Sequence, residues 1–80
     1  MPRLSKRALR DLEQLPGPLR ARAEDIVGRL DLEPALGKKL LGALAGLRSA
    51  RLGRSHRILY RITTDGVFVV TISPRKDAYR

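Results

Sequence analysis

Cysteine and tryptophan are absent from the 80 residues of the chain, and histidine occurs once. Without cysteine the chain can form neither a disulfide nor a thiolate metal site, and a lone histidine argues against a transition-metal centre. A cysteine-free composition also suits a reducing compartment. At this length we expect one domain, residues 1–80, with a modest hydrophobic core and neither a metal nor a small-molecule cofactor.

Long hydrophobic runs are missing as well. No apolar stretch approaches the roughly 20 residues that a membrane-spanning helix requires. Residues 1–7 include three basic side chains and lack the apolar segment of a secretory signal peptide. We therefore expect a cytoplasmic protein that has no membrane partner.

Acidic residues are scarce: the chain has 17 Lys and Arg against 8 Asp and Glu, a net charge of +9. Five arginines lie between Arg48 and Arg61, with no acid among them. Such a local excess indicates a polyanionic partner, either nucleic acid or an acidic protein. Most of the basic residues are arginine, which favours bidentate contact with phosphate or reflects a GC-rich genome.

Two amphipathic helices are predicted in the first half of the chain. Ser5 is a suitable N-cap, and the apolar residues Ala8, Leu12 and Leu15 follow it with helical spacing. The sequence Pro-Gly-Pro at 16–18 ends this helix and supplies a proline for the first turn of the next. The second helix carries one apolar stripe of the same period: Leu19, Ala23, Ile26, Val27 and Leu30. Because each helix has a single stripe, the pair is predicted to form a helical hairpin that lies on another layer.

The second half of the chain is predicted to be mostly strand. Three glycines in residues 35–46 argue against a continuous helix there. We expect one helical turn, at residues 39–43, with the leucines of this connection folded back onto the helices. Three strands separated by glycine-containing turns follow: residues 47–52, 56–63 and 67–72.

Alternation along the second strand separates two kinds of side chain. The two sets are Ile58, Tyr60 and Ile62 on the side expected to be buried, and Arg57, Leu59 and Arg61 on the other. By the same alternation His56 faces away from Arg57. The last strand is almost wholly apolar, and we expect it to be central and covered on both faces. The predicted fold class is α+β: an N-terminal helical hairpin packed on one face of a small antiparallel sheet of three to four strands, with arginines on the open face.

Familiar catalytic groupings are missing from the basic region, which has no paired carboxylates, no Ser/His/Asp set and no phosphate-binding glycine loop. Arginine, lysine, tyrosine and histidine can nevertheless cleave RNA. The 2′-hydroxyl group attacks its own phosphate, and fixed arginines stabilise the extra negative charge of the phosphorane. A cluster of arginines would also lower the pKa of a nearby tyrosine or lysine, which could then act as the base. No metal is required.

Two segments resemble a known family. Residues 46–53 followed by residues 56–61 are similar to a strand pair with the pattern G-x-x-x-x-R-x-G … Y/H-R-[VI]-x-Y, and residues 72–79 are similar to the ending I-x-x-R-[RK]-D-x-Y. Both patterns belong to the RelE/ParE superfamily of toxins from toxin–antitoxin pairs. The resemblance runs over nearly the whole chain and implies the α+β fold described above. RelE-type members cut mRNA in the ribosomal A site without a metal.

The resemblance assigns roles to individual residues. Arg57 matches the mid-strand arginine that stabilises the phosphorane, and Arg75 matches a phosphate-binding arginine after the last strand. Tyr79 matches a C-terminal tyrosine that stacks on a base and orients the substrate or shares in proton transfer. Further residues are expected to contact RNA phosphates: Arg48, Arg51, Arg61 and Lys76.

The chain departs from the family pattern in two places. Some members have lysine on the strand where this chain has Arg48 and Arg51, and arginine is a poor general base because it stays protonated. Family members also usually begin with a strand before the first helix, whereas only residues 1–4 precede Ser5 here. We expect either that this strand is a stub or that the chain start is shortened.

Three functions remain open at this point. The first is a ribosome-dependent mRNA endonuclease toxin, kept silent by a small antitoxin that has an acidic or amphipathic segment. The second is a ParE-like toxin that acts on DNA gyrase, and the third is a non-catalytic module that binds nucleic acid. Arg57, Arg75 and Tyr79 together favour the first, because ParE-type members tend to lack the full set. The expected partners are then the antitoxin, the ribosome and mRNA.

Overall fold

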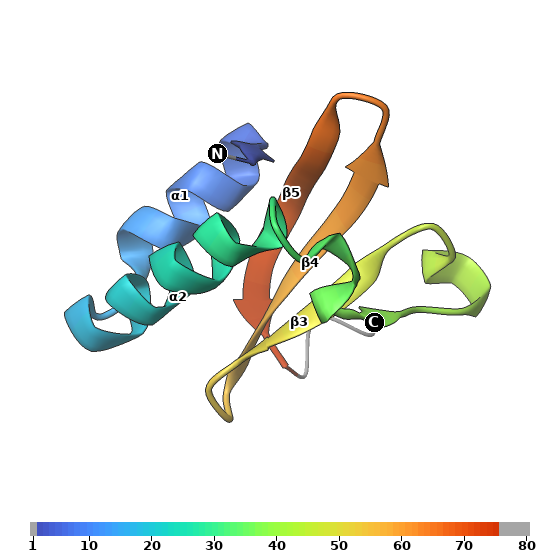
Figure 1. Cartoon of the computed structure of the whole chain (residues 1–80). Helices are drawn as coiled ribbons and strands as arrows, with labels where there is room; N and C mark the ends of the chain where they lie inside the picture. The colour runs from blue at the N-terminus through green and yellow to red at the C-terminus, as the bar shows by residue number, and fades with distance from the viewer. Residues whose placement is uncertain (1, 76–80) are drawn as a thin grey trace.

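The computed structural model describes residues 2–75, which form two layers, a pair of helices and a sheet (Figure 1). The helices are α1 (Lys6–Gln14) and α2 (Gly17–Leu30). The sheet has five strands: β1 (Arg3–Leu4), β2 (Lys38–Lys39), β3 (Arg48–Leu52), β4 (His56–Thr63) and β5 (Gly66–Pro74). Two 3₁₀ turns flank β2, η1 (Pro34–Leu36) and η2 (Gly42–Leu44).

Ser5 caps α1 as the sequence predicts. Its Oγ accepts a hydrogen bond from the Ala8 N–H at 2.9 Å and donates one to the Val70 carbonyl at 2.6 Å. The Ser5 N–H donates to the Val69 carbonyl at 2.9 Å. The cap residue therefore joins the first turn of the helix to β5. At the other end, Leu15 already has extended backbone angles, as expected for a residue before proline.

The strands lie in the order β1-β5-β4-β3-β2. β3, β4 and β5 form the predicted antiparallel meander, and β2 extends it antiparallel to β3. β1 pairs with β5 in parallel, so the sheet is mixed, and the strand expected before the first helix is present as a two-residue segment. The prediction that the last strand is central was wrong, because β4 occupies the middle of the sheet.

Both helices pack on the same face of the sheet, as predicted. The core draws on both layers, with Ala8, Leu12, Ala23, Val27 and Leu30 from the helices and Ala50, Leu52, Ile58, Tyr60, Val67, Val69 and Ile72 from the strands. Burying one of the larger aliphatic side chains contributes about 1.5–3 kcal/mol. This core fixes which face of each strand is left open.

A β-bulge changes the alternation of side chains along β5. Leu59 pairs with Thr71 and the next residue, Tyr60, pairs with Val69, which leaves Val70 as an extra residue. Val69 and Ile72 are three positions apart, and they would lie on opposite faces of a regular strand. Both are buried in the core, because the extra residue reverses the alternation.

Tyr60 is fully buried, as predicted, and its hydroxyl group anchors the connection that follows α2. The hydroxyl accepts a hydrogen bond from the Gly37 N–H and donates one to the Pro34 carbonyl, both at 2.7 Å. A Cβ atom on Gly37 would lie 2.7 Å from the tyrosine ring and 2.9 Å from the Ser49 carbonyl carbon. Glycine is needed here because only a residue without a side chain fits this close approach.

The connection differs from the prediction in two respects. Instead of one helical turn at residues 39–43, it contains two 3₁₀ turns and the short strand β2. Leu41 does not fold back onto the helices but is 86% exposed, and Ile62, predicted to be buried, is 51% exposed. Both line an open groove of about 380 Å³ that has no lining residue from α1 or α2, because the helices do not reach this part of the sheet. No helix in residues 2–75 is long and apolar enough to cross a membrane.

Candidate nucleic-acid interface

The face of the sheet opposite the helices is basic. Paired residues of neighbouring strands share a face, and successive residues of a strand alternate. The strand residues that alternate with the core residues therefore project from the open face, which we call the basic face. Its residues are Arg3, Lys38, Ser49, Arg51, Arg57, Leu59, Arg61, Phe68, Thr71 and Ser73. None of the five strands contains an acidic residue.

Arg51 and Arg57 lie directly opposite each other across β3 and β4. Opposed residues of antiparallel strands have Cα atoms about 5 Å apart, so the two arginine side chains leave the sheet next to each other. Ser73 of β5 continues this row on the other side of Arg57. Like charges in this arrangement repel each other, and a phosphate group between them would be held from two sides.

Arg75 lies at the same end of the sheet. It follows Pro74, the residue of β5 that pairs with His56 at the start of β4. Its N–H donates a hydrogen bond of 2.7 Å to the Ser55 carbonyl in the turn between β3 and β4. The backbone of Arg75 is thereby tied beside the strand ends that carry Arg51 and Arg57, and its side chain is exposed.

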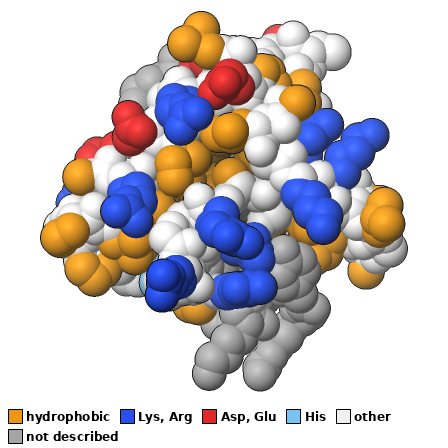
Figure 2. Space-filling model, turned by 60° about the horizontal axis from the view of Figure 1, so that its bottom comes forward, with side chains coloured by type: hydrophobic (Ala, Val, Ile, Leu, Met, Phe, Trp, Pro, Cys, Tyr) orange, Lys and Arg blue, Asp and Glu red, His pale blue; other side chains and the backbone are white. Residues whose placement is uncertain are grey.

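Arg61 belongs to the basic face but lies farther along β4. Its guanidinium carbon lies 5.2 Å from the centre of the Phe68 ring on β5. Figure 2 shows basic side chains spread over much of the face in view, including its centre, lower part and right side, while the acidic side chains in view lie in its upper and left parts.

Arg48 does not join this group. It pairs with the buried Tyr60 and lies three positions before Arg51, on the face that the helices cover. Its Nη1 donates a hydrogen bond of 2.8 Å to the Gly37 carbonyl. Of the two β3 arginines expected to contact RNA phosphates, only Arg51 projects from the basic face, because residues three positions apart on a regular strand point to opposite sides.

Comparisons with known proteins show the family and the fold of this chain. A family model described as the ParE toxin of the type II toxin–antitoxin system parDE matches residues 3–79. Among solved structures, the RelBE2 toxin–antitoxin complex of Mycobacterium tuberculosis is 38% identical in sequence, covering 91% of this chain and 94% of that chain with a TM-score of 0.78.

The chain belongs to the RelE/ParE superfamily of type II toxins.

More distant structures share the fold of this toxin. A YoeB/ParE toxin from Agrobacterium tumefaciens is 21% identical and covers 92% of this chain and 98% of its own, with a TM-score of 0.80. The chromosomal ParDE system of P. aeruginosa provides a chain that is 19% identical over 92% of this chain and 96% of its own, with a TM-score of 0.70. No match was found among curated proteins.

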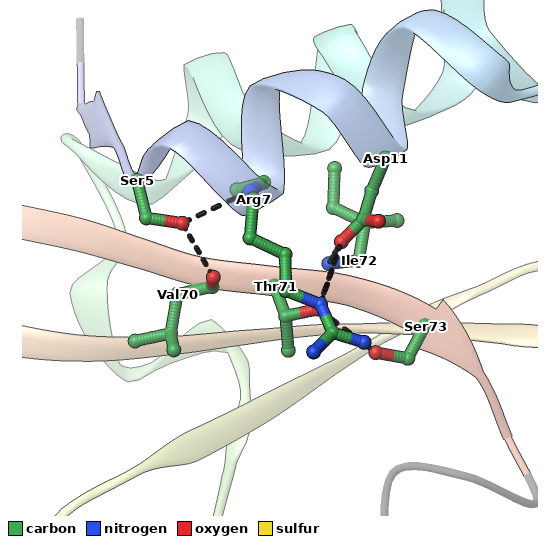
Figure 3. Close-up of polar contacts among 8 residues, drawn as sticks. Ser5, Arg7, Asp11, Val70, Thr71, Ile72 and Ser73 are labelled. Atoms are coloured by element: carbon green, nitrogen blue, oxygen red, sulfur yellow. Dashed lines mark hydrogen bonds and ion pairs between the residues drawn. The ribbon is translucent and has the colours of Figure 1, made fainter.

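A hydrogen-bond network from α1 reaches the basic face of the toxin (Figure 3). One carboxylate oxygen of Asp11 accepts hydrogen bonds from the Thr71 hydroxyl at 2.8 Å and from the Ile72 N–H at 3.1 Å, and Arg7 lies 3.9 Å away. The Thr71 and Ser73 hydroxyl groups are 2.9 Å apart. Asp11 thus accepts hydrogen bonds from the edge of β5 at positions beyond the end of its pairing with β1. It also holds in place the β5 residues that lie next to Arg57 on the basic face.

Only a weak signal for this network is present in the sequence. Asp11 lies three positions after Ala8 and next to Leu12, at the border of the apolar stripe of α1. A border position brings a side chain close to the sheet, but its partners depend on the bulge in β5. Sequence reasoning also missed Phe68 as a residue of the basic face. The face from which its side chain projects is evident only once Val69 is known to pair with Tyr60.

Three predicted residues need separate mention. His56 lines a small pocket with Asp11 and Ile72 on the helix side, which agrees with its expected direction away from Arg57. Its Nδ1 lies 2.7 Å from the Ser55 hydroxyl. Lys76 and Tyr79 lie outside the described residues. Within residues 2–75 no three His, Asp or Glu side chains are grouped so that they could hold a metal ion.

Proposed function

We propose that this toxin is a ribosome-dependent mRNA endonuclease that works without a metal and inhibits translation. The observation that carries the proposal is the cross-strand pair Arg51 and Arg57 on the open face, with Arg75 tied to the same end of the sheet. Folding places two like charges opposite each other, which destabilises the free protein. A bound phosphate would offset that repulsion, because both guanidinium groups would then contact one anion.

The reaction follows from the groups at hand. The 2′-hydroxyl group of a nucleotide gives up its proton to a base as its oxygen forms a bond to the adjacent phosphorus, the bond to the 5′-oxygen breaks, and the 5′-oxygen takes up a proton. The products are a 2′,3′-cyclic phosphate and a 5′-hydroxyl end. Arg57 and Arg75 would stabilise the charge that develops on the phosphorane, and Arg51 would hold the phosphate before attack. Tyr79 would orient the base or share in proton transfer.

Cleavage in a translating extract tests this proposal. Adding the purified toxin should produce mRNA fragments with ends inside the codon of the ribosomal A site. Losing one donor to the transition state typically reduces kcat by about 10²–10³-fold, and we expect this range for Arg57→Ala and for Arg75→Ala. Intact mRNA with the unaltered toxin, or full cleavage by both variants, would overturn the proposal.

A ParE-like action on DNA gyrase is the second candidate, because the matching family model is that of ParE toxins. The same preparations distinguish the two functions. A gyrase poison would produce gyrase-dependent DNA breaks in a supercoiling reaction and leave mRNA intact. The endonuclease would cleave mRNA in the extract and leave gyrase unaffected. In the cell it would act in the cytoplasm.

We further propose an antitoxin with an acidic, amphipathic segment as the partner of this toxin. The groove on the helix side of β3 and β4 combines the exposed apolar side chains of Leu41 and Ile62 with the charges of Lys39 and Arg48. An amphipathic segment would place its apolar side chains on the leucine and isoleucine and its acids against the rim. Leu41→Asp should therefore weaken antitoxin binding without reducing mRNA cleavage, and unchanged antitoxin affinity would count against this docking surface.

A further inference from the structure

Phe68 is the only phenylalanine of the chain, and it lies outside the hydrophobic core. It pairs across the sheet with Arg61, so both side chains project from the basic face. The Arg61 guanidinium carbon is 5.2 Å from the ring centre, within the range of a cation–π contact. An aromatic ring at this place is not required for packing the helices on the sheet.

Arg61 is arranged differently from Arg51 and Arg57. It lies four residues beyond Arg57, about 13 Å along the strand, with the buried Leu59 between them on the same face. Its guanidinium group is held over Phe68, across the sheet, and not directed along β4 towards the other arginines. Arg61 is therefore separate from the row of Arg51, Arg57 and Ser73.

The contact with Phe68 restricts the orientation of a side chain that is otherwise exposed. A guanidinium group held in this way offers a planar, positively charged surface, on which nucleobases stack in many RNA complexes. A single-stranded RNA whose phosphates run past Arg57 would bring a neighbouring base over Arg61.

We propose that Arg61 and Phe68 form a nucleobase-stacking subsite of the RNA interface, in which a base stacks on the Arg61 guanidinium group that Phe68 holds in place. This inference rests on the proposed function in taking RNA as the ligand. It assigns Arg61 to a base, whereas the sequence predicts a phosphate contact, and it adds Phe68 to the interface.

The test compares two ligands with the same number of phosphates. The affinity of the purified full-length toxin is measured, without ribosomes, for a short single-stranded RNA and for an abasic strand of the same length. Stacking of one base corresponds to roughly 5- to 100-fold tighter binding of the RNA that has bases. Arg61→Lys, which keeps the charge but loses the planar group, and Phe68→Leu should each remove most of this ratio. Arg20→Lys on α2 is the matched control and should leave the ratio unchanged.

The outcomes separate this subsite from the proposed function. A ratio of one in the unaltered toxin, or a ratio that Arg61→Lys and Phe68→Leu leave at its original value, would overturn the subsite even if the toxin cuts mRNA. A toxin that cuts no mRNA on the ribosome but keeps an Arg61-dependent ratio would overturn the endonuclease and leave the subsite standing. Arg57→Ala should weaken binding of both strands by the same factor.

Discussion

Replacing Arg48 and Arg51 one at a time by methionine should affect different properties: the first change should lower stability, and the second should lower RNA affinity. The two arginines lie three positions apart on β3 and project from opposite faces of the sheet. Methionine keeps most of the length and volume of the side chain and removes only the charge and the hydrogen-bond donors. The pair of variants therefore compares the two faces of one strand by the same chemical change.

Arg48→Met should destabilise the fold. The half-buried guanidinium group donates a 2.8 Å hydrogen bond to the Gly37 carbonyl. A hydrogen bond from a charged donor contributes about 1.5 kcal/mol or somewhat more. For a domain of this size, a loss of about 1.5 kcal/mol corresponds to a decrease in Tm of roughly 6–12 °C. RNA affinity should change little, because this side chain is on the face away from Arg51 and Arg57.

Arg51→Met should leave the fold as stable as before, or stabilise it by up to about 0.5 kcal/mol, because it removes a like charge opposite Arg57. It should weaken RNA binding. Losing one phosphate contact to a single strand reduces the slope of log affinity against log salt concentration by about 0.7. The slope for Arg48→Met should equal that of the unaltered toxin.

Two measurements check these expectations: urea unfolding followed by far-ultraviolet circular dichroism, and RNA binding by fluorescence anisotropy at several salt concentrations. The reasoning is refuted if Arg48→Met lowers the salt slope as much as Arg51→Met while the free energy of unfolding stays unchanged. That result would mean that both side chains contact RNA and that the assignment of faces from strand pairing is wrong.

Three further substitutions, with Gly28→Ala as a comparison, test the supports of the basic face by urea unfolding. Tyr60→Phe leaves the Gly37 N–H without its acceptor and should reduce the free energy of unfolding by about 2 kcal/mol; a change near zero would show that water replaces the hydroxyl. Gly37→Ala should destabilise by about 3 kcal/mol because its Cβ has no room, whereas Gly28→Ala, in an uncrowded part of α2, should stabilise by about 0.8 kcal/mol; equal effects would contradict the close approach. Asp11→Ala removes two hydrogen bonds to β5 and should destabilise by about 2 kcal/mol, and unchanged stability would show that the network is not a support.

The elements that depend on short-range patterns could be predicted from the sequence. Helical spacing gave both helices, and the Ser5 cap was correct because a cap depends only on the next few residues. The strand β4 was predicted with its observed bounds, since polar and apolar residues alternate along it. From these elements the two-layer architecture followed, because each single apolar stripe must be buried against another layer and the predicted strands provide one.

Features that depend on pairing between distant residues could not be predicted. The bulge at Val70 is set by the register with β4, and it decides the direction of every side chain in the second half of β5. The position of Arg48 depends on Gly37, eleven residues before it, which was not known to lie beside β3. The exposure of Ile62 results from the limited reach of the helices, which no property of β4 itself indicates.

Cleavage of an mRNA that lacks one 2′-hydroxyl group tests the central claim most directly. Purified ribosomes are programmed with two mRNAs that differ only at the A-site nucleotide whose 2′-oxygen would attack. The account predicts rapid cleavage of the all-ribose mRNA to a 2′,3′-cyclic phosphate end, no cleavage at the 2′-deoxy position, and a single-turnover rate about 10²–10³-fold lower for Arg57→Ala. Equal cleavage of both mRNAs, or full activity of Arg57→Ala, would contradict it.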